Sequence, residues 1–404
     1  MMSVKRCALA AAAICGSLSV LAGCGGGSSS RKSSTPPSNT APLVVNAGPT
    51  GNYANGLFTT VTICTPGTST CQAISGVLVD TGSFGLRILS SALTAAQNNG
   101  LEVETDTDGK SIVECAQFSD GVTWGPVVTA DVKIGGEQAR AIPVQIIGDS
   151  HFSNVPSGCS DTGAPENTLQ KLMTNGILGI GNFVQDCPAC GPGTVDNPGL
   201  YYSCTGSSCS VTTVALSQQV ANPIASFTTD NNGVVVELPA VSSSKATLRG
   251  ALVFGIGTRS NNALGDAQVF TIDPSTGNFS TTFKGKTYSN ASFLDTGSNG
   301  FFFLDSSATG LASCKPANGF YCPSSPVMLS ATNTGTNNAK STISFNIDNA
   351  TSLFSVSGNA VFPTLGGPLD GLFDWGLPFF YGRNVYVAIF GATTPGGVGP
   401  YWAY

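Results

Sequence analysis

The stretch Val77-Leu78-Val79-Asp80-Thr81-Gly82-Ser83 returns in outline later in the chain, as Ser292-Phe293-Leu294-Asp295-Thr296-Gly297-Ser298. In each stretch an apolar run, typical of a buried strand, ends at an aspartate, and a tight Thr-Gly-Ser turn follows. A lone carboxylate at the end of an apolar strand is expensive to bury unless it is hydrogen-bonded or shares a proton. A chain that does this twice, 295 − 80 = 215 residues apart, is expected to bring the two carboxyl groups together.

A third copy of the tripeptide, Asp161-Thr162-Gly163, provides an internal comparison. It follows Ser157-Gly158-Cys159-Ser160, without an apolar strand before it, and Ala164-Pro165 comes next. The tripeptide alone therefore arises easily in a chain that contains 50 glycines. Only the copies at Asp80 and Asp295 have the strand context of a functional pair.

Residues 1–23 are predicted to be a signal peptide, because Lys5 and Arg6 precede a short apolar run. That run is too short to be expected to span a membrane. Leu21-Ala22-Gly23-Cys24 resembles a bacterial lipobox, which implies cleavage before Cys24 and lipidation of that cysteine. Several acyl chains on one residue would anchor the protein stably. An ordinary secretory signal is the alternative. The next residue is glycine rather than aspartate, which favours the outer membrane of a bacterial cell envelope.

The rest of the chain is predicted to be a tether and two lobes. Residues 24–41 are rich in Gly, Ser, Pro, Asn and Thr, so we expect a lipidated flexible tether there. The remainder is too long for one ordinary core, and we place an N-terminal β lobe at 42–245 and a C-terminal β lobe at 246–404. Only 10% of residues are charged and few runs suit helices, which favours an all-β exported protein. A net charge of −6 argues against nucleic acid as a partner.

Cysteine usage agrees with export. Of 13 cysteines, two leave with the signal and Cys24 takes lipid, so 13 − 3 = 10 remain, an even number. Spacing suggests five pairs, although it does not fix the connectivity, and a redox-active Cys-x-x-Cys is the alternative at 187–190. Because His151 is the only histidine and the cysteines pair locally, we expect no metal and no cofactor. The expected pairs are Cys64–Cys71, Cys187–Cys190, Cys204–Cys209, Cys314–Cys322 and Cys115–Cys159.

Both halves of the chain repeat one order of elements. A hairpin leads to the aspartate, an apolar strand follows the Thr-Gly-Ser turn, and an apolar element ending in glycine comes later. That glycine is Gly179 in the first half and Gly376 in the second, 179 − 80 = 99 and 376 − 295 = 81 residues after the aspartate. This is the pattern of a diverged duplication, which a site shared between two halves requires.

These motifs resemble the pepsin-like aspartic proteases, and the likeness extends from about Leu57 to Phe390. The resemblance implies an all-β, two-lobed pepsin-like fold with a few short helices. It also implies that Asp80 and Asp295 form the catalytic dyad, and that Gly179 and Gly376 support the two loops from below. The residues implied to brace the loops are Thr81, Gly82, Ser83, Thr296, Gly297 and Ser298.

The chemistry expected of such a dyad follows from its charge. Two carboxylates close together hold one proton across a broad acidic range. The ionised member can take a proton from a water between them, and the other can donate one to a scissile carbonyl. Because the titration belongs to the pair, neither aspartate is assigned permanently as the base.

Three positions depart from the pattern of this family. Arg87 stands where an aromatic residue is usual, and Phe118 is the candidate flap residue although it lacks the hydroxyl of the usual tyrosine. Asp374-Trp375 precedes Gly376 in place of two aliphatic residues. Phe118 has an equal claim to be a plain sheet aromatic, and we expect Asp374 to be a loop or capping residue. His151 is expected to lie at the surface or to have its hydrogen bonds made within the fold. A single histidine gives little support to a serine or cysteine catalytic triad.

We therefore predict an aspartic endopeptidase tethered to the bacterial envelope, facing the periplasm or the outside. We expect a monomer that takes a polypeptide into its interlobe cleft and meets the membrane through its lipid anchor. One alternative is a catalytically weak or inactive protease-like lipoprotein that binds peptide without cutting it, and the sequence also resembles bacterial lipoproteins of unassigned activity. The other is a structural envelope protein in which the two aspartates only stabilise loops.

Overall fold

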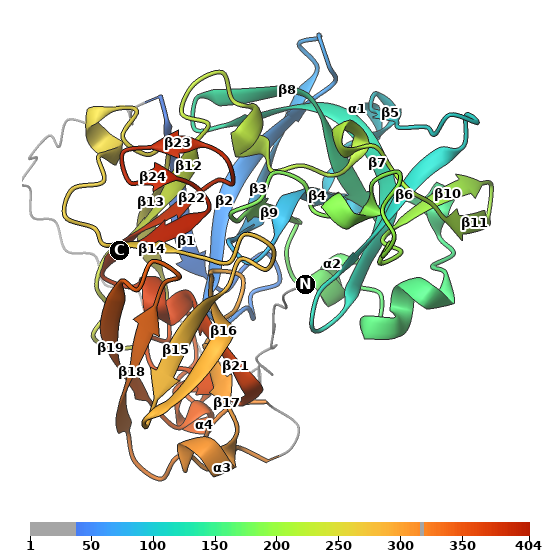
Figure 1. Ribbon diagram of the computed structural model, residues 1–404. Helices are drawn as coiled ribbons and strands as arrows, with labels where there is room; N and C mark the ends of the chain where they lie inside the picture. Colours follow the sequence, from blue (N-terminus) through green and yellow to red (C-terminus); the bar gives the residue numbers. More distant parts are fainter. Residues whose placement is uncertain (1–37, 316–318) are drawn as a thin grey trace, which may run out of the picture.

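The computed structural model describes residues 38–315 and 319–404, and strands dominate both ranges (Figure 1). The all-β prediction is therefore confirmed. The predicted signal peptide, Cys24 and most of the predicted tether lie outside the described residues. Within the described ranges there are four α-helices, none of them long and apolar enough to cross a membrane. They are α1 (Ala95–Asn99), α2 (Leu169–Leu172), α3 (Ser306–Thr309) and α4 (Ala350–Phe354).

The first lobe is built around a closed ring of six strands. Each strand pairs with the next in the order β7–β8–β4–β9–β3–β2, and β2 pairs in turn with β7. The ring strands are β2 (Gly56–Cys64), β3 (Cys71–Asp80), β4 (Phe84–Leu89), β7 (Val122–Ile134), β8 (Glu137–Ile147) and β9 (Gly176–Ile180). Outside the ring lie β5 (Glu102–Val103), β6 (Ser111–Gln117), β10 (Tyr201–Thr205) and β11 (Ser208–Val211).

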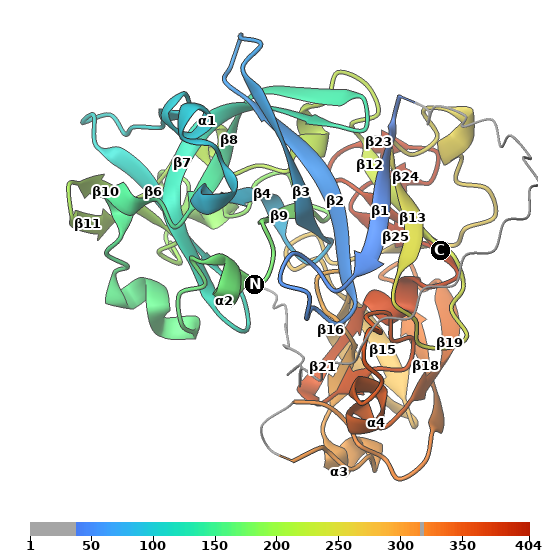
Figure 2. The same cartoon turned by 180° about the vertical axis from the view of Figure 1, so that it is seen from behind.

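Beyond β2, the sheet continues with strands that come from distant parts of the chain. Strand β1 (Thr40–Asn46) lies between β2 and β13 (Leu248–Phe254), as the view from behind shows (Figure 2). Strand β1 begins two residues before the predicted start of the first lobe. Strands β12 and β13 pair with each other across the predicted lobe boundary, so the division at 245/246 stays a prediction. The further strands are, in order, β12 (Gly233–Leu238), β22 (Arg383–Ala388), β25 (Tyr401–Ala403) and β14 (Val269–Thr271).

The second lobe contains a separate sheet of seven strands, drawn at the bottom of Figure 1. Its aromatic core is continuous, since Phe303 contacts Phe373, Phe345 and Phe283. In spatial order the strands are β19 (Lys340–Ile347), β18 (Val327–Thr334), β15 (Phe279–Phe283), β16 (Lys286–Asp295), β21 (Leu369–Gly376), β17 (Phe301–Leu304) and β20 (Gly366–Gly367). A small hairpin, β23 (Thr393–Thr394) and β24 (Gly397–Val398), completes the chain's strands in the described ranges.

The same three-strand arrangement carries the aspartate in each lobe. Strand β3 runs parallel to β9 with Asp80 opposite Gly179, and β16 runs parallel to β21 with Asp295 opposite Gly376. The glycine-bearing strand then pairs antiparallel with the strand after the turn, β4 or β17. A Cβ atom on Gly376 would lie 2.1 Å from the carbonyl oxygen of Gly300, so a side chain does not fit there. The repeated order expected from the sequence is thus present as repeated topology.

The cysteine pairs expected from spacing are confirmed. The bridges are Cys64–Cys71, Cys115–Cys159, Cys187–Cys190, Cys204–Cys209 and Cys314–Cys322. The third Asp-Thr-Gly lies in a 3₁₀ turn, Ser157–Thr162, and not at the end of a strand. The contrast drawn from strand context therefore holds in the structure.

Candidate functional site

The two aspartates at the strand ends meet between the lobes. Asp80 and Asp295 are both fully buried. A Cβ atom on Gly82 would lie 2.6 Å from Cγ of Asp295, and one on Gly297 would lie 2.7 Å from Oδ1 of Asp80. The glycine of each turn therefore lies against the carboxyl group of the other lobe. Glycine is required at both positions because any side chain would push the two carboxyl groups apart.

Each carboxyl group is also held by its own turn, in the same way in both lobes. Oδ1 of Asp80 accepts a hydrogen bond from the Gly82 amide at 2.8 Å, and Oδ2 accepts one from Ser83 Oγ at 2.6 Å. The second turn repeats the pattern for Asp295, with the Gly297 amide at 2.7 Å and Ser298 Oγ at 3.0 Å. These bonds fix the orientation of both carboxyl groups before any substrate binds.

The two threonines tie the turns together. The amide of Thr81 donates to Oγ1 of Thr296 at 3.1 Å, and the amide of Thr296 donates to Oγ1 of Thr81 at 3.0 Å. The hydroxyl of Thr81 donates to the carbonyl of Leu294 at 3.0 Å, and that of Thr296 to the carbonyl of Val79 at 2.7 Å. All four bonds cross from one lobe to the other. The geometry is that of the cross-brace that the family resemblance implies.

The electrostatics of the pair follow from burial and like charge. The pKa of Asp295 is raised well above its ordinary value, first by burial, then by the charges of Asp80 and Asp374, and by a hydrogen bond with Asp80. The amide of Gly297 acts in the opposite direction. Two carboxyl groups so placed cannot both ionise readily, so they hold a proton in common.

The raised pKa predicts how stability depends on pH. An acid whose pKa is higher in the folded state stabilises the fold below its unfolded pKa of about 3.9, and this contribution disappears as pH rises through the folded value. We therefore expect the free energy of unfolding to fall as pH rises above about 4, by about 1.4 kcal/mol for each unit by which the folded pKa exceeds the unfolded one. Thermal denaturation of the wild type and of Asp295→Asn across this range measures the effect. The variant lacks the titrating group and should give the flatter profile; parallel profiles would contradict the raised pKa.

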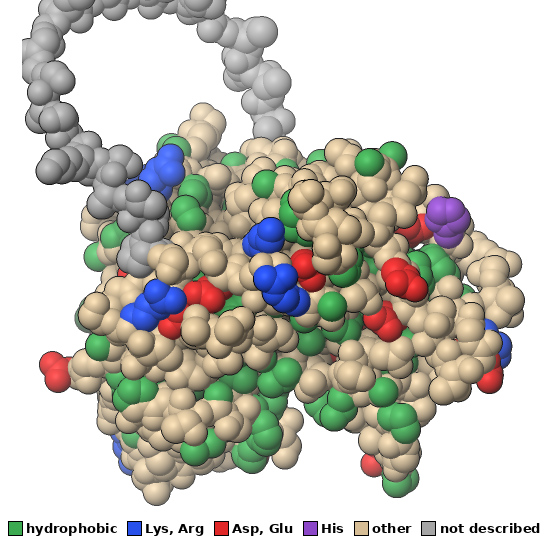
Figure 3. Space-filling model, turned by 90° about the horizontal axis from the view of Figure 1, so that it is seen from above, with side chains coloured by type: hydrophobic (Ala, Val, Ile, Leu, Met, Phe, Trp, Pro, Cys, Tyr) green, Lys and Arg blue, Asp and Glu red, His purple; other side chains and the backbone are tan. Residues whose placement is uncertain are grey.

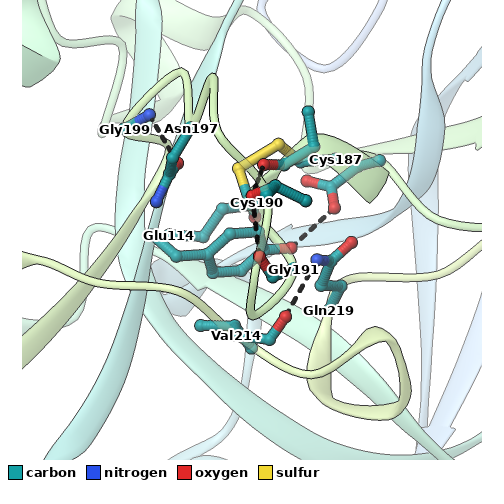
Figure 4. The surroundings of a disulfide bond; sticks show 12 residues. Glu114, Cys187, Cys190, Gly191, Asn197, Gly199, Val214 and Gln219 are labelled. Atoms are coloured by element: carbon teal, nitrogen blue, oxygen red, sulfur yellow. Dashed lines mark hydrogen bonds between the residues drawn. A yellow bond between two sulfur atoms is a disulfide. The ribbon is translucent and has the colours of Figure 1, made fainter.

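A buried ionic network lies next to the first turn. The Arg87 guanidinium bonds to the carboxylate of Glu114, to Asp186 Oδ2 at 2.9 Å and to the carbonyl of Phe84 at 2.7 Å. The Tyr201 hydroxyl donates to Asp186 Oδ1 at 2.6 Å. Figure 4 shows Glu114 among the surroundings of the Cys187–Cys190 disulfide, which follows Asp186 directly in the chain. The network therefore fixes the strand after the first turn to two distant segments.

The charges in this network shift one another's pKa. Burial acts to lower the pKa of Arg87, but Glu114 and Asp186 outweigh it and the pKa is raised. The pKa of Asp186 is raised well above its ordinary value by burial and by the charge of Glu114, against the effect of Arg87. The cation therefore stays charged and balances the buried carboxylate of Glu114 and the partly buried carboxyl group of Asp186.

A small pocket of about 60 Å³ opens beside the first turn. It is bounded by residues 82–84, by residues 116–118 at the tip of the β6–β7 hairpin, and by Arg87, Asp186 and Leu200. The predicted flap residue, Phe118, thus borders the space next to the turn. Its ring is only 5% exposed, and the Arg87 guanidinium carbon lies 6.0 Å from the ring centre. The flap role of Phe118 stays a prediction.

Sequence reasoning missed the partners of Arg87 and misplaced one aspartate. Glu114 and Asp186 are 27 and 99 residues from Arg87, and the only signal was a lone cation inside an apolar strand, which requires buried carboxylates nearby.

The expectation that Asp374 is a loop or capping residue was wrong. Asp374 lies within β21 and its Oδ2 contacts Ser298 Oγ, because that strand begins already at Leu369 and pairs with β16 on one side and β17 on the other. His151, the purple side chain in Figure 3, is 80% exposed, as expected.

Comparisons with known proteins agree with this description of the fold. A family model described as "Protein of unknown function (DUF3443)" matches residues 35–404. No curated protein is significantly similar in sequence. Among solved structures, the chain is similar to the aspartic proteinase from Irpex lacteus, with a TM-score of 0.50 and 16% identity. That likeness covers 90% of this chain and 96% of the other, and at this identity it shows the fold: all-β, two-lobed and pepsin-like.

Proposed function

The chain belongs to the DUF3443 family, and for this member we propose the activity of an aspartic endopeptidase. One observation carries the proposal. Two buried carboxyl groups from opposite halves of the chain lie together, each against the glycine of the other's turn. The raised pKa of Asp295 supports it, since a pair that shares a proton contains both an acid and a base at the same pH.

The proposed reaction uses a water bound between the two carboxyl groups. The ionised carboxylate takes a proton from this water, and the water oxygen attacks the scissile carbonyl carbon. The protonated carboxyl group donates its proton to the carbonyl oxygen, giving a neutral tetrahedral intermediate. Collapse of this intermediate breaks the C–N bond, with a proton passing to the leaving amine. The hydrogen bonds from Gly82, Ser83, Gly297 and Ser298 reach all four carboxyl oxygens, which fixes the orientation of both groups around the water.

A cleavage assay tests the proposal against the two alternatives. The full-length protein, purified in detergent, is incubated with a denatured polypeptide at roughly pH 3 to 7, the range in which a shared-proton pair can act. We expect internal cleavage products by mass spectrometry, and we expect a statine-type inhibitor to block their formation. Saturable peptide binding without cleavage would favour the peptide-binding alternative. Absence of both binding and cleavage would favour a structural role.

We also propose that the protein is anchored to the bacterial envelope through Cys24, which lies outside the described residues. The support is the lipobox-like sequence before it. Changing Cys24→Ser should move the protein from the membrane fraction to the soluble fraction, because two or more acyl chains provide the anchor. Separation of outer and inner membranes then tests the outer-membrane assignment. Unchanged membrane association of the variant would contradict anchoring at this cysteine.

A further inference from the structure

A third carboxyl group is connected to the second turn. Asp374 lies in β21 opposite Phe293 of β16, and it is only 3% exposed. Its Oδ2 is 2.5 Å from Oγ of Ser298. The same hydroxyl lies 3.0 Å from Oδ2 of Asp295. Ser298 therefore bridges Asp374 to the aspartate of the proposed dyad.

The bridge has fewer hydrogens than two ionised carboxylates would require. A serine hydroxyl has one hydrogen to donate and lone pairs to accept with. If Asp295 and Asp374 were both ionised, one of the two contacts would bring lone pairs together without a hydrogen between them. One of the two carboxyl groups therefore carries a proton and donates it to Ser298. The contact with Asp374, at 2.5 Å, is the shorter of the two and lies at the short end of the O–H···O range.

The charged groups around this third carboxyl group are mostly acidic. Strand β16 brings Asp295 to it and the turn of the first lobe brings Asp80. Asp370 lies on the same strand but is exposed, and Asp305 follows β17 beyond the residue that pairs with Leu369. The lysine of β16, Lys286, is exposed at the opposite end of that strand. The two groups closest to the bridge are thus carboxyl groups.

We propose that Asp374 is a positioning residue that extends the proton-sharing pair to a triad, Asp80–Asp295–Asp374, coupled through Ser298. The triad keeps two protons at a pH where the pair alone would keep one. In the active form the proposed dyad has one proton, and Asp374 has the other and donates it to Ser298. The kinetic consequence rests on the proposed endopeptidase function, whereas the proton count does not.

The triad predicts a direction for the pH dependence of activity. Whichever carboxyl group ionises first, its charge makes the others hold their protons more tightly. The proton shared by Asp80 and Asp295 is therefore retained to a higher pH than it would be without Asp374. This agrees with the contribution of Asp374 to the raised pKa of Asp295, after those of burial and Asp80. Activity should extend toward neutral pH as a result.

Replacing Asp374 with asparagine tests the kinetic part. The amide has the same shape and can donate to Ser298, so the bridge persists without a titrating group. We expect the alkaline limb of the kcat/KM profile to move down by about one pH unit in Asp374→Asn, with KM nearly unchanged. The matched control is Asp370→Asn, an exposed aspartate on the same strand, which should leave the profile in place. Should the asparagine variant fold poorly, Asp374→Leu removes the carboxyl group and avoids a buried polar atom. An unchanged alkaline limb in a folded variant would overturn the proposal.

A direct count of protons keeps the test independent of activity. Carboxyl ¹³C NMR of the full-length protein, with labelled aspartate, follows the buried carboxyl groups through a pH titration. In the acidic range where an isolated pair shares one proton, the wild type should retain two protons on these groups and Asp374→Asn should retain one. A wild-type cluster that retains only one would overturn the triad. If the protein cleaves nothing, the endopeptidase proposal fails while this titration still decides the triad.

Discussion

Changing either aspartate of the proposed dyad to asparagine, Asp80→Asn or Asp295→Asn, is expected to reduce the rate of peptide hydrolysis by at least about a thousandfold. An amide can neither take a proton from the water nor give one to the carbonyl at the pH of the reaction. Both carboxyl groups are needed in the proposed mechanism, so the double variant should be no slower than the slower single variant. Initial rates of cleavage of a quenched fluorescent peptide measure the effect.

The substitution is a stringent one because it preserves the geometry around it. Asparagine can still accept from the Gly82 amide with its carbonyl oxygen, and its NH2 group can donate to the Ser83 hydroxyl, so the turn is expected to survive. A matched control is Asp273→Asn, since Asp273 is partly exposed and belongs to a surface turn. Cleavage by both dyad variants at the wild-type rate would mean that the activity arises elsewhere or from a contaminant. Loss of activity in the control would point to a general defect instead.

Changing Arg87→Met is expected to lower the free energy of unfolding by about 3–5 kcal/mol. The guanidinium is 3% exposed and pairs with Glu114 and Asp186, whose side chains are 0% and 6% exposed. Without the cation, two carboxyl groups remain buried together with no opposite charge. Methionine fills a similar volume, so the loss reports on the charge more than on packing. Chemical denaturation at neutral pH measures it.

Two comparison variants separate a broken ion pair from a lost side chain. Arg259→Met removes a cation that is 37% exposed beside Asp230 and Glu137, and it should change stability by at most about 1 kcal/mol. The double variant Arg87→Met/Glu114→Met removes the guanidinium and the carboxylate of Glu114, and leaves Asp186 with its bond from Tyr201; it should recover part of the stability that Arg87→Met alone loses. An Arg87→Met protein as stable as the wild type would show that the network contributes nothing. Failure of the double variant to recover would assign the loss to packing or to the remaining Asp186, and not to the Arg87–Glu114 pair.

The sequence predicted most accurately those features that depend on residues close together in the chain. An apolar strand was expected directly after each Thr-Gly-Ser turn, and β4 (Phe84–Leu89) and β17 (Phe301–Leu304) lie there. The cysteine pairs were correct because four of the five close short loops, which leaves one pair by elimination. The hairpin β18–β19 was missed, since its strands carry Ser, Thr and Asn among few large apolar residues. Strand β1 was partly assigned to the tether, because its apolar stretch is short and is buried only by pairing with β2 and β13.

By itself, the sequence indicated that the two carboxyl groups at the strand ends lie together. An acid at the end of a buried apolar strand costs free energy unless it shares a proton or a hydrogen bond. The sequence also indicated the all-β class, the Thr-Gly-Ser turns and the four disulfide pairs that close short loops, all of which depend on residues close together in the chain. Only the tertiary structure decided that Glu114 and Asp186 neutralise Arg87, and that Ser298 connects Asp374 to Asp295. The contacts of Arg87 with Glu114 and Asp186, and of Ser298 with Asp374, join residues that are 27 to 99 positions apart, so no periodic pattern in the sequence indicates them. Pairing partners in a sheet are set by which strands become neighbours, and that choice belongs to the folded chain as a whole.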